Sequence, residues 1–286
     1  NIVDDIHMNV THVIRGDDHV ENTYRHVALF QALGAPVPKY AHLPMIVNAQ
    51  GKPYSKSDGA AYVGDFRDKG FLPDALFNFL VLLGWSPGDD REVLDRGELV
   101  KLFTLDRVQS SPAKMDLTKF EWMNGEYMKK VPPSQFGAKC RELLLAGGVA
   151  LDGVAADYFD RVLALLRDRI KQWDNVVPMT GYFFTEEYAY DQKSVDKRLK
   201  KEGALTSLKL IRDRFAALAE FNAATTDKVL HDLATEKAVN AGELVHPIRV
   251  AVSGTAVGPS LFHMLETMGK DRVLKRIDKT LHLYSR

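Results

Sequence analysis

Hydrophobic residues in the first fifth of the chain follow first a strand pattern and then a helix pattern. Residues 10–14 form a β-branched run that predicts a buried strand, and the charged turn at residues 15–19 ends it. A helix is predicted next, because apolar residues recur at helical spacing as far as Gly34: Val20, Tyr24, Val27, Phe30 and Leu33. Residues 42–47 predict a second strand. Ligands of open α/β sheets lie at the carboxyl ends of strands, so the charged turn is well placed to meet one.

Helical spacing dominates after residue 72. Pro73 and Asp74 suit the first turn of a helix, and Gly84 suits its end. The pattern predicts further helices over residues 98–103, 117–128, 134–145, 157–171, 194–221, 234–241, 259–269 and 270–283. Ser253 and Gly254 predict a turn, and the pair Pro132 and Pro133 predicts a domain boundary. The expected fold class is α/β followed by mostly α.

Composition narrows the class of protein. A hydrophobic content of 45% and a charged content of 27% are typical of a globular protein that buries a core. The longest apolar runs are too short to span a bilayer and residue 1 begins no signal peptide, so we expect a cytoplasmic protein without membrane contact. The single cysteine, Cys140, excludes an internal disulfide and a multi-cysteine zinc site.

Charge is balanced overall but not locally. Lys and Arg number 38, as do Asp and Glu, which argues against a non-specific binder of polyanions. Cations are concentrated in residues 193–201 and 269–286, and Arg286 belongs to the second run. Each run can be either a patch for a specific RNA or a solvated helix face.

Residues 51–59 carry the most distinctive chemistry. Gly51, Pro53 and Gly59 favour a loop of definite shape. Glycine permits backbone conformations that are closed to other residues, and proline fixes its own φ. Within it, Ser55, Lys56 and Ser57 offer hydroxyls and a compact positive charge that suit a phosphate. An exposed polar turn is an equally good interpretation of the loop alone.

The order of the motifs adds a resemblance. Residues 11–19, 42–44 and 55–59 resemble the second half of the catalytic domain of glutamyl-tRNA synthetases. Residues 71–76, 83–86 and 122–127 resemble the segments that follow in that family. Residues 246–251, with Gly258 and Pro259, resemble the signature of its anticodon-binding domain.

This resemblance implies a class I aminoacyl-tRNA synthetase. Residues 1–131 would be the C-terminal part of a Rossmann-type catalytic domain, with a KMSKS-type loop and a helical region that connects to the stem-contact part. Residues 132–286 would be a helical anticodon-binding domain. The family uses ATP with Mg²⁺ to form glutamyl-adenylate and pyrophosphate, then transfers glutamate to tRNA-Glu. We therefore expect tRNA-Glu, glutamate and ATP as partners of a monomer. No zinc site is expected, because His12, His42 and His246 lack ligand spacing.

The resemblance also implies roles for single residues. Lys56 matches the catalytic lysine that stabilises the triphosphate in the transition state. The ATP-binding positions are Asp18, Ile46, Pro53, Tyr54, Ser55, Lys56 and Ser57. Pro53 stands where many members carry a first lysine, and Tyr54 where they carry an aliphatic residue; Lys52 can substitute for the missing charge.

Three further positions complete the expected site residues. Arg15 and Asn1 match glutamate-binding positions, and a guanidinium can pair with a carboxylate in bidentate geometry. The alternative for Arg15 is a structural ion pair with Asp17 or Asp18. Arg169 matches a position that reads the anticodon, and its alternative is a solvated helix residue.

The first half of the family's catalytic domain, with its HIGH-type signature, has no counterpart in the sequence. We therefore expect a fragment that is inactive alone, with an α/β part that is poorly stable because its sheet has an open edge. A non-catalytic tRNA-binding module and an inert gene remnant remain alternatives. Whether the full protein also charges tRNA-Gln stays open.

Overall fold

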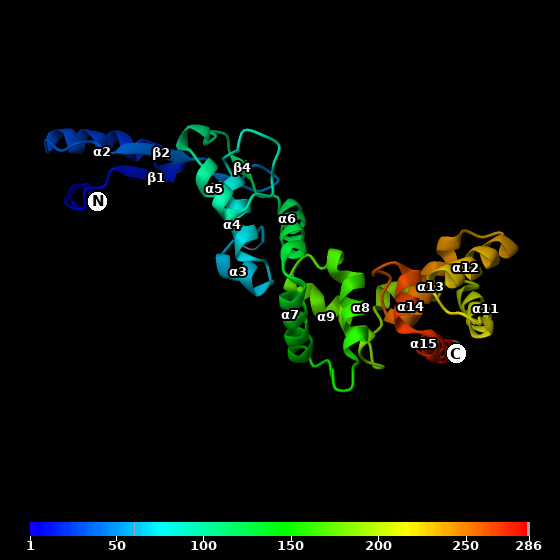
Figure 1. Cartoon of the computed structure of the whole chain (residues 1–286). Coiled ribbons are helices and arrows are strands. Elements are labelled where there is room, and N and C mark those ends of the chain that lie inside the picture. Colours follow the sequence, from blue (N-terminus) through cyan, green and yellow to red (C-terminus); the bar gives the residue numbers. More distant parts are fainter. Residues whose placement is uncertain (60, 285–286) are drawn as a thin grey trace. The chain divides into compact units, whose positions relative to one another are not determined.

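The computed structural model of the chain describes residues 1–59 and 61–284, and the chain divides into two compact units (Figure 1). Unit 1 is Asn1–Lys130 and unit 2 is Val131–Arg286. Unit 1 begins with α/β structure, and unit 2 is built from helices throughout its described residues. The expected order of an α/β part followed by a mostly helical part is confirmed.

Unit 1 opens with a strand–helix–strand crossover. Strand β1 (His12–Gly16) pairs in parallel with β2 (Lys39–Leu43), and α2 (Val20–Ala32) connects them after the 3₁₀ helix η1 (Asp17–His19). In Figure 1, α2 runs beside both strands. Helix α1 (Ile2–His7), which the hydrophobic pattern did not predict, precedes β1. Parallel pairing places the ends of β1 and β2, at Gly16 and Leu43, next to each other.

The single strand predicted at residues 42–47 is wrong. Strand β2 ends at Leu43, and β3 (Ile46–Val47) belongs to a second sheet, where it pairs in parallel with β4 (Ala113–Lys114). Pro44 separates the two strands, because proline has no N–H to continue a ladder. Gly84 packs against Pro44 so closely that a Cβ there would lie 2.4 Å from Pro44 Cγ.

Aromatic residues form the core of the rest of unit 1. The helices are α3 (Val63–Asp68), α4 (Pro73–Leu82), α5 (Arg96–Leu102), η2 (Leu105–Arg107) and α6 (Leu117–Lys130). The Phe120 ring stacks on Phe71 and Phe79, with centroids 4.3 and 4.6 Å away. The predicted helices at residues 73–83 and 117–128 are thus confirmed as α4 and α6, packed on each other through these rings.

Unit 2 has more and shorter helices than the sequence pattern predicts. They are α7 (Pro133–Ala146), α8 (Ala156–Leu166), η3 (Arg167–Arg169), η4 (Trp173–Asn175), α9 (Val176–Thr180), η5 (Gly181–Phe183), α10 (Gln192–Arg198), α11 (Ala204–Ala217), α12 (Ala223–Lys237), α13 (Ala241–Ser253), α14 (Leu261–Met268) and α15 (Lys270–Tyr284). The helix predicted at residues 157–171 ends at Leu166. That predicted at 194–221 breaks at Gly203, whose φ of +77° is left-handed. The helix predicted at 234–241 is also wrong, because α12 stops at Lys237 and α13 starts at Ala241.

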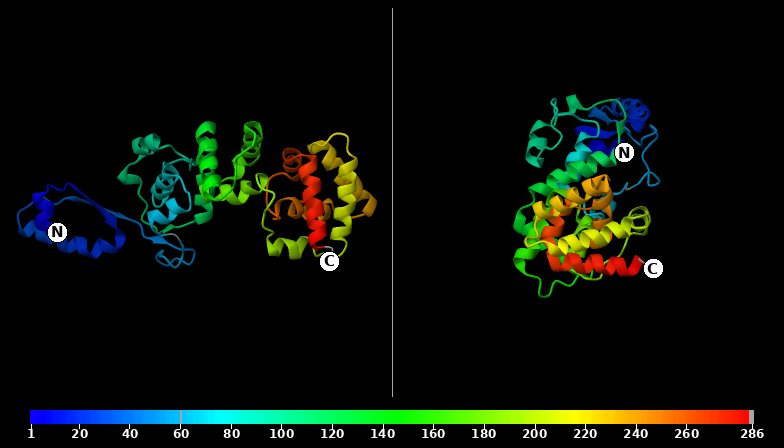
Figure 2. Two further views of the ribbon diagram at one scale, coloured as in Figure 1. Left: turned by 90° about the horizontal axis from the view of Figure 1, so that it is seen from below. Right: turned by 90° about the vertical axis from the view of Figure 1, so that its right-hand side faces the viewer.

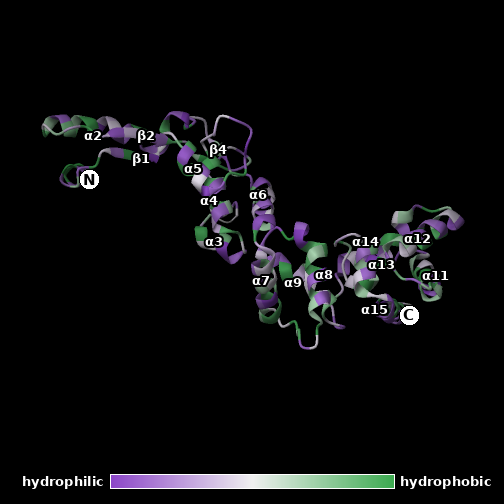
Figure 3. Ribbon diagram, in the orientation of Figure 1, coloured by the Kyte–Doolittle hydropathy of each residue, from purple (hydrophilic) through white to green (hydrophobic). Residues whose placement is uncertain are grey.

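One part of the core of unit 2 lies between α11, α13 and α15, and another is formed by buried residues of α7 and α8. Helices α11 and α15 run side by side (Figure 2). Leu208, Ile211, Val273 and Ile277 are fully buried there. Hydrophilic and hydrophobic residues alternate along the helices of this unit, as α8 illustrates (Figure 3). Amphipathic helices such as α8 thus bury one side, whereas residues 247–253 of α13 are all buried.

One arginine of the predicted cationic run at residues 269–286 belongs to this core. Arg276 is 1% exposed and donates hydrogen bonds to the carbonyls of Tyr182, Val252 and Thr185 at 2.8, 2.6 and 2.6 Å. Lys270, Arg272 and Lys279 also have partners within the unit. Both interpretations of the run, an RNA patch and a solvated face, are wrong for Arg276; Arg286 lies outside the described residues.

Candidate functional site

A single carboxylate organises the loop that follows β3. Asp58 Oδ2 accepts hydrogen bonds from the backbone N–H and the hydroxyl of Ser55, both at 2.9 Å. Asp58 Oδ1 accepts from the Asn48 side-chain amide at 2.8 Å. These three bonds hold the pKa of Asp58 below its usual value, with the Asn48 bond as the largest cause. The sequence analysis missed both residues, although an acid directly after Ser55, Lys56 and Ser57 was a visible signal.

The start of the loop is a tight turn built on Asn48. Its side-chain oxygen accepts from the backbone N–H groups of Gln50 and Lys52, both at 3.0 Å. Pro53 then pairs with Val47 in an antiparallel bridge, and the Tyr54 N–H donates to the Ile46 carbonyl at 2.9 Å. Pro53 and Tyr54 thus fix the returning strand, and the Ile46 carbonyl is engaged by the loop itself.

The tip of the loop presents Lys56 to solvent. Lys56 is exposed and forms no ion pair with the described residues. The hydroxyls of Ser55 and Ser57 point at each other, 2.8 Å apart, so both are used inside the loop. A cavity of about 480 Å³ lies beside the loop and is lined by Tyr54, Asp58 and Lys114, among others. The loop therefore leaves its lysine, rather than its hydroxyls, free for a ligand.

A second group of polar side chains gathers where β1 and β2 end. Arg15 Nη2 donates to the Thr23 hydroxyl at 2.6 Å and to the His19 carbonyl at 3.3 Å. The same hydroxyl lies 2.9 Å from His42 Nε2, and the Arg15 guanidinium lies 5.4 Å from the centre of the Tyr40 ring. Among the described residues Arg15 forms no ion pair, so the alternative of a pair with Asp17 or Asp18 is wrong.

The other expected residues of this region lie at its edge. Asp18 is exposed and stands 3.8 Å from His19 Nε2. Its carboxylate covers Gly16, where a Cβ would come within 2.5 Å of Asp18 Oδ1. Asn1 is exposed at the start of α1, and its side chain makes no capping hydrogen bond. The structure thus brings Arg15 together with Thr23, His42 and Tyr40, which the sequence analysis did not group with it.

In unit 2 the notable side chain is a buried arginine of α13. Arg249 is 8% exposed, and its buried Nη1 has no hydrogen-bond partner among the described residues. A Cβ at Gly258 would lie 2.8 Å from that nitrogen. Burial lowers the pKa of Arg249. Tyr182 raises that pKa, and the charge of the exposed Arg169 on η3 lowers it further. An unsatisfied buried donor such as Arg249 Nη1 calls for an explanation, and a bound ligand, ion or water is one.

The described residues contain no cluster of three or more His, Cys, Asp or Glu side chains arranged to hold a metal ion. No helix within residues 1–59 and 61–284 is long and apolar enough to cross a bilayer.

Two family models match the chain in consecutive segments. The catalytic domain of class I tRNA synthetases (E and Q) matches residues 1–122, and an anticodon binding domain matches residues 135–281. The fold and these two matches define a class I aminoacyl-tRNA synthetase segment joined to an anticodon-binding segment.

Individual relatives narrow the class to a family. The chain is 36% identical over 280 residues to glutamate–tRNA ligase 2 of Thermoanaerobacter pseudethanolicus, covering 98% of this chain and 58% of that protein. It is 40% identical over 280 residues to the glutamate–tRNA ligase of Xylella fastidiosa, covering 98% and 59%. The crystal structure of a glutamate tRNA ligase from Elizabethkingia meningosepticum, in complex with its amino acid, matches with a TM-score of 0.73 and 27% identity, covering 99% of this chain and 59% of that one. The chain belongs to the glutamyl-tRNA synthetase family, and it spans a little under three fifths of the length of these relatives.

Proposed function

We propose that this chain is the part of a glutamate–tRNA ligase that carries the ATP-triphosphate loop and reads the anticodon. The whole enzyme would activate glutamate with ATP and Mg²⁺ and transfer it from glutamyl-adenylate to tRNA-Glu. The observation that carries the proposal is that one chain joins a class I catalytic segment to an anticodon-binding segment and matches glutamate–tRNA ligases over 98% of its length. The protein would act as a monomer in the cytoplasm.

In this proposal the loop at residues 51–59 compensates the charge of the triphosphate. The exposed Lys56 supplies the positive charge, and phosphoryl chemistry depends mainly on such positioned charge. Ser55 and Ser57 act through the loop's shape, because their hydroxyls bond within it. Pro53 and Tyr54 set its return strand. Mg²⁺ would arrive with ATP.

The polar group at the ends of β1 and β2 would take the amino acid. Arg15 would pair with a glutamate carboxylate, while Thr23 and the Tyr40 ring hold the guanidinium in place. Asp18 would face the ribose of ATP, and the backbone near Ile46 would face its adenine. Asn1 would complete the amino-acid side of the site.

In unit 2, Arg249 and Arg169 would read the anticodon. Arg249 Nη1 has no hydrogen-bond partner among the described residues, so it keeps its donors for base edges, which single-stranded RNA loops present. A Cβ at position 258 would lie 2.8 Å from Arg249 Nη1, so glycine at this position leaves that nitrogen uncrowded. We propose a division of labour, with catalysis in residues 1–131 and anticodon binding in 132–286, and the two family models and the two compact units support it.

A second candidate function is a tRNA-binding module without catalysis. It is favoured by the exposure of apolar side chains around the two-stranded sheet, where Ile14 is 49% and Leu43 is 38% exposed. A catalytic centre needs rigid support, and two strands with uncovered faces supply little. The chain alone would then bind tRNA without forming an adenylate.

Two assays of the 286-residue chain test these functions. We expect no glutamate-dependent ATP–pyrophosphate exchange by the chain alone. Exchange at a rate above background would contradict the prediction that the chain alone is inactive. We expect a gel shift with tRNA-Glu that weakens when the anticodon is changed. The absence of any shift at low salt would mean an inert chain and contradict the proposal. Aminoacylation of tRNA-Glu and tRNA-Gln by the full-length protein decides whether both are substrates.

A further inference from the structure

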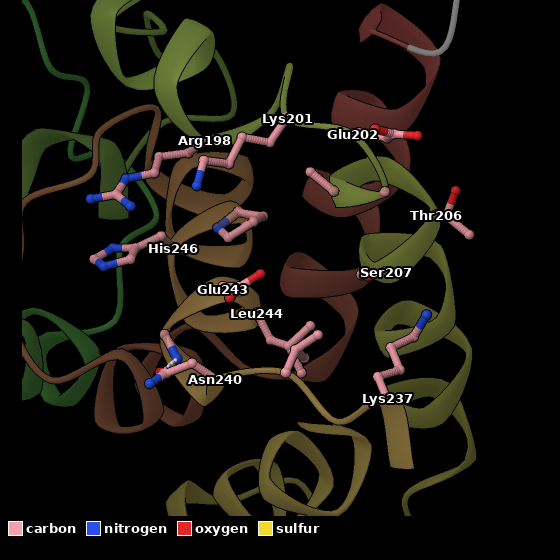
Figure 4. Close-up of a pocket in the computed structure, with 15 residues that line it drawn as sticks. Arg198, Lys201, Glu202, Thr206, Ser207, Lys237, Asn240, Glu243, Leu244 and His246 are labelled. Carbon is pink, nitrogen blue, oxygen red and sulfur yellow. Dashed lines mark hydrogen bonds between the residues drawn. The ribbon is translucent and has the colours of Figure 1, made fainter. Parts of the chain in front are cut away.

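Unit 2 contains a cavity that none of the roles above uses. It has a volume of about 640 Å³ and lies between the turn that joins α10 to α11 and the first turns of α13 (Figure 4). Arg198, Lys201, Lys237 and His246 line it, together with Glu202 and Glu243. Figure 4 shows Arg198, Lys201 and His246 gathered at one end of the cavity and Lys237 at the other.

The cations of this cavity lack carboxylate partners. Arg198, Lys201 and Lys237 form no ion pair with any described residue, whereas the neighbouring Lys200 pairs with Asp196 at 2.7 Å. Cations exceed acids in the lining by one, with His246 counted as neutral. Arg198 Nε and His246 Nδ1 are both buried without a hydrogen-bond partner. Unsatisfied buried nitrogens beside an unpaired guanidinium favour an anionic ligand.

His246 links this cavity to Arg249. Burial lowers the pKa of His246, and the charges of Arg198, Arg249 and Lys197 lower it further, in that order. His246 stands one helical turn before Arg249 on α13 and lines the same cavity as Arg198. Three like charges around one ring repel each other, and a bound anion would relieve that repulsion.

We propose that Arg198, Lys201 and His246 hold a backbone phosphate of the RNA whose bases meet Arg249. This inference rests on the proposed anticodon-binding function and adds to it a phosphate contact that positions the RNA. A phosphodiester carries a single negative charge, which matches the surplus of one cation in the lining. His246 lines the cavity and lies one helical turn from Arg249 on α13, and this continuity favours RNA over a free phosphate as the source of that charge.

The test is the salt dependence of tRNA-Glu binding by the 286-residue chain. Each lost phosphate contact with single-stranded RNA reduces the slope of log K against log salt by about 0.7. We expect Arg198→Gln and Lys201→Gln each to reduce the slope by about that amount and to weaken binding about tenfold at low salt, equally for every anticodon. Lys201 is exposed and unpaired, so Lys201→Gln tests the contact even if Arg198→Gln unfolds the unit.

The matched control is Lys228→Gln, which removes an exposed cation of α12 that pairs with Asp232 at 3.4 Å and does not line the cavity. It should leave the slope unchanged. Wild-type slopes in both cavity variants would overturn the phosphate contact while leaving anticodon binding intact. Saturable binding of inorganic phosphate that Lys201→Gln abolishes, with an unchanged RNA slope, would assign the cavity to a small anion and also overturn it. Failure of the wild-type chain to bind tRNA at all would instead overturn the proposed function on which it rests.

Discussion

Asp58 Oδ2 accepts hydrogen bonds from both the backbone N–H and the hydroxyl of Ser55, each at 2.9 Å. These two bonds join Ser55 to Asp58 and so close the loop around Lys56, which lies between them in the chain. The shape of the loop thus depends on a carboxylate that need not touch a phosphate. A positioning residue of this kind acts on the ligand only through the backbone that it holds.

Replacement of Asp58 should loosen the loop without unfolding unit 1. In Asp58→Ala the Ser55 N–H and the Asn48 amide both lose their acceptor. We expect amide exchange across residues 51–59 to accelerate by about tenfold or more, measured by mass spectrometry. The control is Asp68→Ala, which removes an exposed carboxylate paired with Arg67 at 2.9 Å and should leave the loop unchanged. Equal exchange in Asp58→Ala and wild type would contradict the role of Asp58.

Low pH should loosen the loop at residues 51–59 in the same way as Asp58→Ala. The pKa of Asp58 lies below the free value of 3.8, because its hydrogen bonds favour the charged form. Its contribution is therefore complete above about pH 4 and is lost as pH falls through the lowered pKa. Exchange of residues 51–59, corrected for the intrinsic pH dependence of the amides, should be constant from pH 6 to 8 and rise only below pH 4. A transition near neutral pH would contradict this.

Gly254 should tolerate no side chain. It ends α13 with a φ of +76°, and a Cβ would lie 2.0 Å from the Ala189 carbonyl oxygen. Gly254→Ala should therefore destabilise unit 2 by about 3 kcal/mol or more, measured by urea denaturation. Gly148 has a similar φ of +78° but nothing within 4 Å of its Cβ position. Gly148→Ala should cost only about 1 kcal/mol, so similar losses in the two variants would exclude the steric explanation.

Arg249 should contribute to binding rather than to stability. A buried guanidinium without a partner costs free energy, so Arg249→Met should leave unit 2 at least as stable as the wild type. The same variant should bind tRNA-Glu about tenfold more weakly and lose the preference for its anticodon. In Arg249→Met the affinity for tRNA-Glu should thus fall while the melting temperature does not. A large drop in stability with unchanged discrimination would show that Arg249 is structural.

The crossover of β1 and β2 should open more easily than the aromatic core of unit 1. Two strands with exposed Ile14 and Leu43 bury little, whereas Phe120 and Met123 are fully buried. We expect amides of residues 8–50 in the chain alone to exchange far faster than those of α4 and α6. Strong protection across residues 8–50 would contradict the poor stability predicted for this part.

Local sequence determined the elements whose signals are contained in a few neighbouring residues. Pro73 and Gly84 mark the two ends of α4, and the apolar stripe of residues 20–33 marks α2. The order of short motifs also indicated the family, because those motifs depend on residue identity and spacing alone. The phosphate loop that we propose at Ser55, Lys56 and Ser57 rests on the same kind of local signal.

The tertiary structure decided what depends on partners distant in the chain. Helical spacing continues through Gly203, yet the chain turns there with a left-handed φ of +77°, and α10 packs on α13 while α11 packs on α13 and α15. The burial of Arg276 depends on carbonyls more than 20 residues away, and the pairing of Arg15 with Thr23 and His42 depends on the meeting of β1, α2 and β2. A periodic pattern records which face of an element is apolar, but not which element covers it. The sequence therefore named the family and the loop lysine, while only the fold assigned Asp58, Arg249 and the cavity around Arg198 their surroundings.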